Sequence, residues 1–398
     1  MSAPSSSNDI LPIPQSPDAQ LEGEGVPYRH RTIDIGADRT DTARQIDVLS
    51  FGEPGARPKA YIQTALHADE LPGMLVMRRL IDALSAAVHR GDLLGEVVLV
   101  PVANPIGLAQ IEGDYMQGRV EKGTDRNFNR GFPDFADLIK DKVAPRLSDD
   151  GEANTSIIRE EMKNALSAIT PKDAFETLQL VLIELAYDAD IVLDLHADNE
   201  AMVHLYTGKK LWPEATDLAA EIDARAILLC DFAGDAPFDE ACGGPWWTLA
   251  DAFPDRPIPP ACLSATVELR SNNEVSGDLA DRDATALMRF LVRRGLIKGR
   301  AGALPRLLGE AIALEQMHRL KATTEGVVDY KLKLGDSVRQ GDVIAEVTPV
   351  LGEIEVIRAP IDGLLFARHD QTWAWPGKTI GKIAGSSAQA QAPKEDKV

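Results

Sequence analysis

Cysteine is scarce in this chain, and its scarcity excludes a fold held together by disulfide bonds. The 398 residues include three cysteines, Cys230, Cys242 and Cys262, which are odd in number and widely spaced. None of them belongs to a C-x-x-C pair, so buried free thiols are the simplest interpretation. Because free thiols are typical of a reducing compartment, we expect a cytoplasmic protein.

Long apolar runs are also missing. No window approaches the roughly 18 uninterrupted apolar residues that a membrane helix needs, and the N-terminal residues lack the basic start and apolar core of a secretory signal. We therefore expect no membrane partner. The polar, proline-bearing composition of residues 1–25 predicts a disordered tail.

Basic residues are outnumbered, since 42 Lys and Arg face 62 Asp and Glu and the formal net charge is -20. A polyanion would be repelled at long range, so nucleic acid is a poor partner. A small anionic substrate remains compatible with this charge, because it responds to local arginines in a pocket. The sequence leaves open whether the chain forms homo-oligomers.

Short apolar runs alternate with helical periodicity over residues 26–315, which we interpret as one domain of the α/β class. Residues 31–100 predict the order strand, strand, helix, strand. The individual predictions are strands at 60–66, 97–102, 191–195 and 265–269, helices at 74–88, 174–186 and 281–295, and a helical surface insertion at about 134–175. Such alternation predicts a mixed, mostly parallel sheet with helices on both faces.

Residues 322–384 are rich in β-type runs separated by glycine, with Gly-Asp pairs that are typical of hairpin turns. This pattern resembles the barrel-sandwich fold of biotinyl and lipoyl carrier domains. The hairpin that carries the modified lysine in such domains would lie near residues 350–353, where the sequence is Val-Leu-Gly-Glu. We therefore predict an unmodified β domain, followed by a disordered tail at 385–398.

Two histidines and a glutamate follow β-type runs in the α/β part. His67 and Glu70 stand three residues apart after the run at 60–66, and His196 ends the run at 191–195. Open α/β sheets place their ligand sites outside the carboxyl ends of the strands. Two imidazoles, one carboxylate and an open position for water are the ligand set of a hydrolytic zinc site. The spacing therefore predicts one Zn²⁺ per chain at His67, Glu70 and His196.

A hydrolytic zinc site also needs a general base, and Glu268 is the candidate. It lies within the apolar run at 265–269, where a carboxylate is costly unless charge or function retains it. The alternative is a partly exposed glutamate on an edge strand. Beside the metal motif, we favour catalysis.

A turn-rich segment at 118–133 contains Arg119, Asn129 and Arg130. In a pocket, guanidinium groups bind carboxylates and stabilise oxyanions, whereas on the surface they are solvated. Charge alone does not decide between these alternatives. His204 is more readily explained as a structural histidine than as a pocket residue, and the sequence assigns no role to Arg126 or Arg270.

The order H-x-x-E, R…N-R-x-F-P, D-L-H and T-V-E-L resembles the succinylglutamate desuccinylase/aspartoacylase family, relatives of the zinc carboxypeptidases. The resemblance covers about residues 45–300. It implies that His67, Glu70 and His196 bind zinc and that Glu268 is the general base and later the acid.

The resemblance also assigns the arginines and the asparagine. It implies that Asn129 and Arg130 hold a substrate carboxylate and that Arg119 polarises the scissile carbonyl. Family members often read E-[IL]-G where this chain has Glu268-Leu269-Arg270. This and similar differences from the family motifs leave the predicted metal ligands unchanged. They alter neighbouring residues, however, so the substrate cannot be inferred from the family.

The sequence thus predicts a zinc-dependent hydrolase that cleaves the linear amide of an N-acyl amino acid or a related small, carboxylate-bearing amide. A metallocarboxypeptidase acting on small peptides uses the same machinery. A non-catalytic metal-binding interaction protein is the alternative from another class, and the full set of ligands, base and arginines argues against it.

Overall fold

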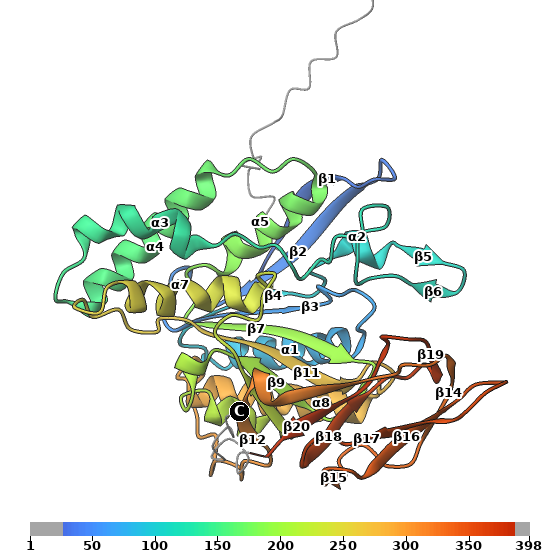
Figure 1. The fold of residues 1–398 in the computed structure, drawn as a ribbon. Coiled ribbons are helices and arrows are strands. Elements are labelled where there is room, and N and C mark those ends of the chain that lie inside the picture. The colour runs from blue at the N-terminus through green and yellow to red at the C-terminus, as the bar shows by residue number, and fades with distance from the viewer. Residues whose placement is uncertain (1–26, 387–398) are drawn as a thin grey trace, which may run out of the picture.

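The computed structural model describes residues 27–386, which form a large α/β part and a smaller β part beside it (Figure 1). The predicted disordered tails, 1–25 and 385–398, lie outside the described residues except for Gly385 and Ser386. Gly385 ends a strand, so regular structure continues past the predicted boundary. No helix between residues 27 and 386 has the length and apolar character of a membrane span.

Nine strands of the described chain form the main sheet, in the order β1-β2-β4-β3-β7-β11-β9-β10-β12. Their bounds are β1 Arg29–Ala37, β2 Ala43–Phe51, β3 Lys59–Thr64, β4 Glu96–Val100, β7 Ile191–Asp198, β9 His204–Thr207, β10 Ala226–Leu229, β11 Leu263–Ser271 and β12 Glu310–Ala313. The pairs β3–β4, β3–β7, β7–β11, β9–β10 and β10–β12 are parallel, and β1–β2, β2–β4 and β9–β11 are antiparallel. The predicted mixed, mostly parallel sheet is confirmed.

Helices cover both faces of this sheet, as predicted (Figure 1). One face carries α1 Pro72–His89, α6 Thr216–Glu221 and α8 Gly277–Arg293, and the other carries α3 Phe135–Val143, α4 Gly151–Ala168, α5 Ala174–Ala186 and α7 Phe238–Ala252. The predicted helical insertion contains α3 and α4. The break between them ends at Asp150, whose side chain caps α4.

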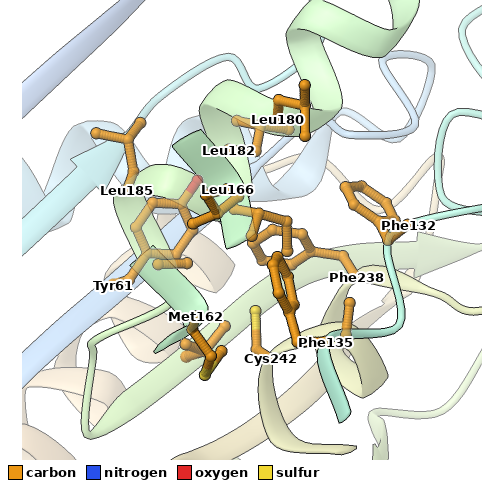
Figure 2. Close-up of a cluster of buried hydrophobic side chains, with 14 of the residues drawn as sticks. Tyr61, Phe132, Phe135, Met162, Leu166, Leu180, Leu182, Leu185, Phe238 and Cys242 are labelled. Carbon is orange, nitrogen blue, oxygen red and sulfur yellow. The ribbon is translucent and has the colours of Figure 1, made fainter. Parts of the chain in front are cut away.

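The side chains of the central strands alternate between two hydrophobic cores. In β3, Ala60 and Ile62 pack against the α1, α6 and α8 layer, whereas Tyr61 packs on the opposite side. Figure 2 shows this second core, where Phe135, Met162 and other side chains from the insertion meet Tyr61. Because both faces of the sheet are covered, most side chains of the inner strands β3, β4, β7 and β11 are buried.

The β part consists of two antiparallel sheets, β13-β20-β18-β15 and β17-β16-β14-β19. Their strands are β13 Met317–Lys321, β14 Gly326–Tyr330, β15 Ser337–Val338, β16 Val343–Thr348, β17 Glu355–Arg358, β18 Gly363–Arg368, β19 Trp373–Ala374 and β20 Thr379–Gly385. The first of these strands begins before the predicted boundary at 322. A short strand of the α/β part, β8 (Glu200–Ala201), pairs with β18 and joins the two parts.

Candidate active site

His67 and Glu70 lie in the loop that connects β3 to α1, at the carboxyl end of β3. Asn104 holds the start of this loop, because its Nδ2 donates to the carbonyl of Leu66 at 2.9 Å. Gly118 packs directly on the loop: a Cβ at this position would lie 2.2 Å from the amide nitrogen of Asp69. A glycine is therefore required where the two segments cross.

His196 reaches the same place from β7, the parallel neighbour of β3. One ligand atom each from His67, Glu70 and His196 lies within 4.8 Å of the other two, and all three residues are buried. The structure thus brings together the three residues that the spacing indicated. They could hold a metal ion.

Hydrogen bonds to the outer nitrogens fix the two imidazoles. Nε2 of His67 lies 2.9 Å from Oδ1 of Asn127, and Nε2 of His196 lies 2.8 Å from Oδ2 of Asp194. A ring that donates through Nε2 keeps the lone pair of Nδ1 free. Both Nδ1 atoms face the Glu70 carboxylate, at 3.0 Å for His67 and 2.7 Å for His196. The residues therefore fit a zinc ion in donor type and in outer support.

The electrostatics of the cluster favour a charged Glu70 and a neutral His67. Burial alone would raise the pKa of Glu70, but the two histidines hold it well below its usual value. Burial lowers the pKa of His67, which suits a ligand that must be neutral. Burial acts in the same direction on His196, but Asp194 and Glu70 outweigh it and raise the pKa of His196 well above its usual value.

Glu268 lies on β11 in register with His196 on β7. The strand runs between β7 and β9, so the expected alternative is wrong in placing Glu268 on an edge strand, although the residue is partly exposed. Burial and the negative charge of Glu70 raise the pKa of Glu268 to about 8. Its Oε2 is buried and has no hydrogen-bond partner among residues 27–386. An orphaned carboxyl oxygen in such a place is available to a water molecule or a substrate.

The segment that follows Gly118 supplies the positive charge. Nη1 of Arg119 lies 3.1 Å from Oε1 of Glu70 and 3.3 Å from Nδ1 of His67. Asn129 is buried, and its Oδ1 accepts from the amide of Phe238 at 2.8 Å. Arg130 is half-buried and donates to the carbonyl of Asn129. The segment is therefore folded against the cluster of His67, Glu70 and His196, while the side chain of Arg119 is 55% exposed.

Sequence reasoning missed Asn127 and Asp194 as supports of the histidines. The role of Asp194 was predictable, because it precedes His196 by two residues on a buried strand and so points to the same face. The role of Asn127 was not, since its contact with His67 joins residues 60 positions apart.

The three residues without an assigned role have structural partners. Arg126 pairs with Glu121 and Asp173. Arg270 has a φ of 69°, in the region that favours glycine, and its buried ion pair with Asp283 offsets that strain. His204 is buried beside Phe366 with a pKa lowered to about 4 by burial, so the structural interpretation is supported.

The β part reaches this region through Lys382 on β20. Nζ of Lys382 forms an ion pair with Asp198, two residues after His196. The side chains are largely buried, with exposed fractions of 23% and 13%. The pair fixes the end of β7, which carries a candidate metal ligand, to the C-terminal β part.

We expect Lys382→Met to lower the free energy of unfolding by about 3 kcal/mol, because it leaves Asp198 buried without its counter-charge. The double variant with Asp198→Asn should recover much of this loss. Lys331→Met is the matched control, since Lys331 forms more exposed pairs within the β part, and this substitution should lower the free energy of unfolding much less. Denaturant unfolding measures all four proteins, and equal losses in the two lysine variants would contradict the role of the pair.

Comparisons with known proteins agree with this geometry. Residues 56–167 match the model of the succinylglutamate desuccinylase/aspartoacylase catalytic domain. The chain is 24% identical over 387 residues to the N-alpha-acetyl-L-2,4-diaminobutyric acid deacetylase of Halomonas elongata. The aligned region covers 94% of this chain and 95% of that protein.

Two solved structures show how far the fold extends. A succinylglutamate desuccinylase/aspartoacylase family protein from Shewanella amazonensis is 26% identical to this chain and superposes on it with a TM-score of 0.76. The superposition covers 89% of this chain and 98% of that protein. The product-bound ectoine utilization protein EutE (DoeB) from Ruegeria pomeroyi shares the fold at 18% identity, with a TM-score of 0.64 and coverage of 96% and 100%. The catalytic-domain model, the full-length relative and the shared fold thus all relate this chain to the succinylglutamate desuccinylase/aspartoacylase family.

Proposed function

We propose that this chain is a zinc-dependent hydrolase that releases the acyl group of an N-acyl amino acid, or of a related small amide that carries a carboxylate. The observation that carries the proposal is the buried cluster of His67, Glu70 and His196 with Glu268 in register beside it. The family and its deacetylase relative support a deacylase, and the donor set supports zinc. We also propose that the protein is cytoplasmic and that its β part carries no covalent modification.

His67, Glu70 and His196 would hold the zinc ion. When bound, zinc supplies Lewis acidity toward the substrate carbonyl and lowers the pKa of water. The chain itself keeps the ligands in position: Asn127 and Asp194 hold the outer nitrogens of the two rings, so that each Nδ1 stays directed at the cluster.

Glu268 would accept the proton of the attacking water and deliver it to the departing amine. Two features of the residue support this role. Its Oε2 makes no hydrogen bond with the described protein, so a water molecule or an amine can take that place. Its raised pKa of about 8 is suited to a group that must hold a proton during part of the reaction near neutral pH.

Arg119 and Arg130 would divide the negative charges of the substrate between them. Arg119 contacts the metal cluster, so its guanidinium would lie beside the oxygen that becomes negative. Arg130 lies farther along the segment and, with Asn129, would hold the substrate carboxylate. Asn129 is itself anchored to the start of α7, which makes this part of the site rigid.

The test is metal content together with hydrolysis of a substrate panel. The panel holds N-acetyl and N-succinyl amino acids, N-acetyl-diaminobutyrate, which the Halomonas relative suggests, and small peptides. We expect one zinc per chain, hydrolysis of at least one N-acyl amino acid, and loss of activity after chelation that zinc restores. Preference for the peptides would favour a carboxypeptidase, and a zinc-loaded protein that cleaves nothing would overturn the proposal.

Arg130→Ala and Arg119→Ala should differ in their kinetics. A carboxylate clamp holds ground state and transition state alike, so Arg130→Ala should mainly raise KM. An oxyanion contact strengthens as charge develops, so Arg119→Ala should mainly lower kcat. Lysine at position 130 should rescue little, because an ammonium group lacks the bidentate fork.

The control for both variants is Lys122→Ala, in the same segment but with two thirds of its side chain exposed. Its KM and kcat should stay near those of the unsubstituted protein. If the two arginine variants behave like this control on a substrate with a free carboxylate, neither arginine has the proposed role.

A further inference from the structure

A cavity of about 740 Å³ lies between the helical insertion and the segment that carries Arg130. Its lining includes Ile169, Phe175 and Leu180 from the insertion side, and Asn127 and Arg130 from the segment. It is separate from the residues that would bind zinc but directly next to them. Asn127 lines the cavity and also holds Nε2 of His67 through Oδ1.

Of the two arginines that line the cavity, only Arg130 is free to bind an anion. Arg126 pairs with Glu121 and Asp173, and its guanidinium lies 4.1 Å above the ring of Phe175. Arg130, by contrast, forms no ion pair with any of residues 27–386, and the one hydrogen bond of its guanidinium there goes to the carbonyl of Asn129. A substrate carboxylate bound near the zinc site would therefore meet Arg130 at the edge of the cavity.

One wall of the cavity is suited to an apolar group. Ile169, Phe175 and Leu180 form an apolar wall. Glu176 also lines the cavity, but its carboxylate is bound to the amide and ammonium groups of Lys172. Gln179 and the exposed Asp235 also line the cavity, so its hydrophobic surface is confined to the wall that Ile169, Phe175 and Leu180 form.

The size of the cavity matters as well. Pockets of roughly 300–1,000 Å³ take ligands of drug size, so an acetylated alanine would leave most of this one filled with water. In an N-acyl amino acid, the carboxylate and the side chain leave the same α-carbon. A carboxylate on Arg130 therefore places the side chain within reach of the cavity.

We infer that this cavity binds the amino-acid side chain of the substrate and selects large apolar side chains, aliphatic or aromatic. The inference rests on the proposed function and specifies its substrate class. It assigns Ile169 and Leu180 as specificity-determining residues.

The experiment compares N-acetyl derivatives of alanine, diaminobutyrate, leucine and phenylalanine with zinc-loaded protein. Because each buried methylene strengthens binding roughly fourfold, kcat/KM for the phenylalanine derivative should exceed that for the alanine derivative by roughly 30-fold or more. Ile169→Trp and Leu180→Trp fill the cavity and should abolish the preference for phenylalanine over alanine. Two variants are used because Leu180 also packs in the core, whereas Ile169 is half-buried.

Leu138→Trp is the matched control, because Leu138 belongs to the insertion but is 44% exposed and does not line the cavity. It should keep the preference for phenylalanine. Equal kcat/KM values across the side chains, a preference for diaminobutyrate, or a preference that both cavity variants retain would overturn the inference.

Binding separates this inference from the proposed function. If the protein hydrolyses neither these derivatives nor any other N-acyl amino acid of the panel above, the proposed function fails, and thermal stabilisation by the same four compounds then reports on the cavity. Greater stabilisation by N-acetylphenylalanine than by N-acetylalanine, lost in Ile169→Trp and kept in Leu138→Trp, would still support the side-chain site. Equal stabilisation by both compounds would overturn it.

Discussion

Glu268→Gln should keep the fold and the metal content of the protein but lower turnover by roughly two to four orders of magnitude, the range that general acid–base catalysis contributes. The amide is nearly isosteric with the carboxyl group, so the packing of β11 should not change. It cannot accept the proton of the attacking water, however, and it cannot deliver a proton to the departing amine.

The control is Glu184→Gln, which makes the same chemical change on the exposed surface of α5 and should leave turnover unchanged. Zinc content and thermal unfolding of both variants establish that the loss belongs to the reaction. Near-normal turnover by Glu268→Gln, with zinc bound and the fold intact, would require a different base.

The elements nearest the site were predictable because their patterns are local. The strands that carry His196 and Glu268 are short apolar runs, and the helix after Glu70 has a clear apolar periodicity closed by glycine. Parallel strands end at one edge of a sheet, so residues at the ends of two such runs were expected to meet. The cluster of His67, Glu70 and His196 follows from these local patterns.

The order of the strands in the sheet and the first strand were not predictable from the sequence. The order of strands places β11 in the interior of the sheet, and nothing in its own sequence distinguishes that position from an edge. The first strand, β1, was not recognised as one of three strands before the first helix, because most of its residues are polar and partly exposed. The position of β11 depends on pairing partners that are remote in sequence, whereas β1 lacks an apolar pattern of its own.

Contacts between distant segments were equally hidden. Lys382 meets Asp198 across 184 residues, and Asn127 meets His67 across 60. Neither contact leaves a repeat, a spacing or a composition bias in the sequence. The same is true of the cavity beside Arg130, whose two sides come from the helical insertion and from the arginine-bearing segment. Substrate specificity is therefore the part of the function that the sequence reveals least.

His67→Ala and His196→Ala should each remove most of the zinc affinity, because three protein ligands leave no redundancy. The residues behind the ligands should matter less. Asn127→Ala and Asp194→Ala remove the groups that orient the two rings, and we expect a loss of roughly 10- to 100-fold in affinity. These two variants should still fill with zinc when the metal is in excess, whereas the histidine variants should not.

Metal analysis after dialysis against a graded series of zinc concentrations measures the zinc affinity of each variant and so tests this ranking. His89→Ala is the control, because His89 lies exposed at the end of α1 and bonds to a backbone carbonyl of its own helix. Full zinc stoichiometry in both His67→Ala and His196→Ala would refute the assigned ligands. A loss in the Asn127 and Asp194 variants as large as in the histidine variants would instead show that these two residues do more than orient the rings, since support through a hydrogen bond weakens a site without removing a donor from it.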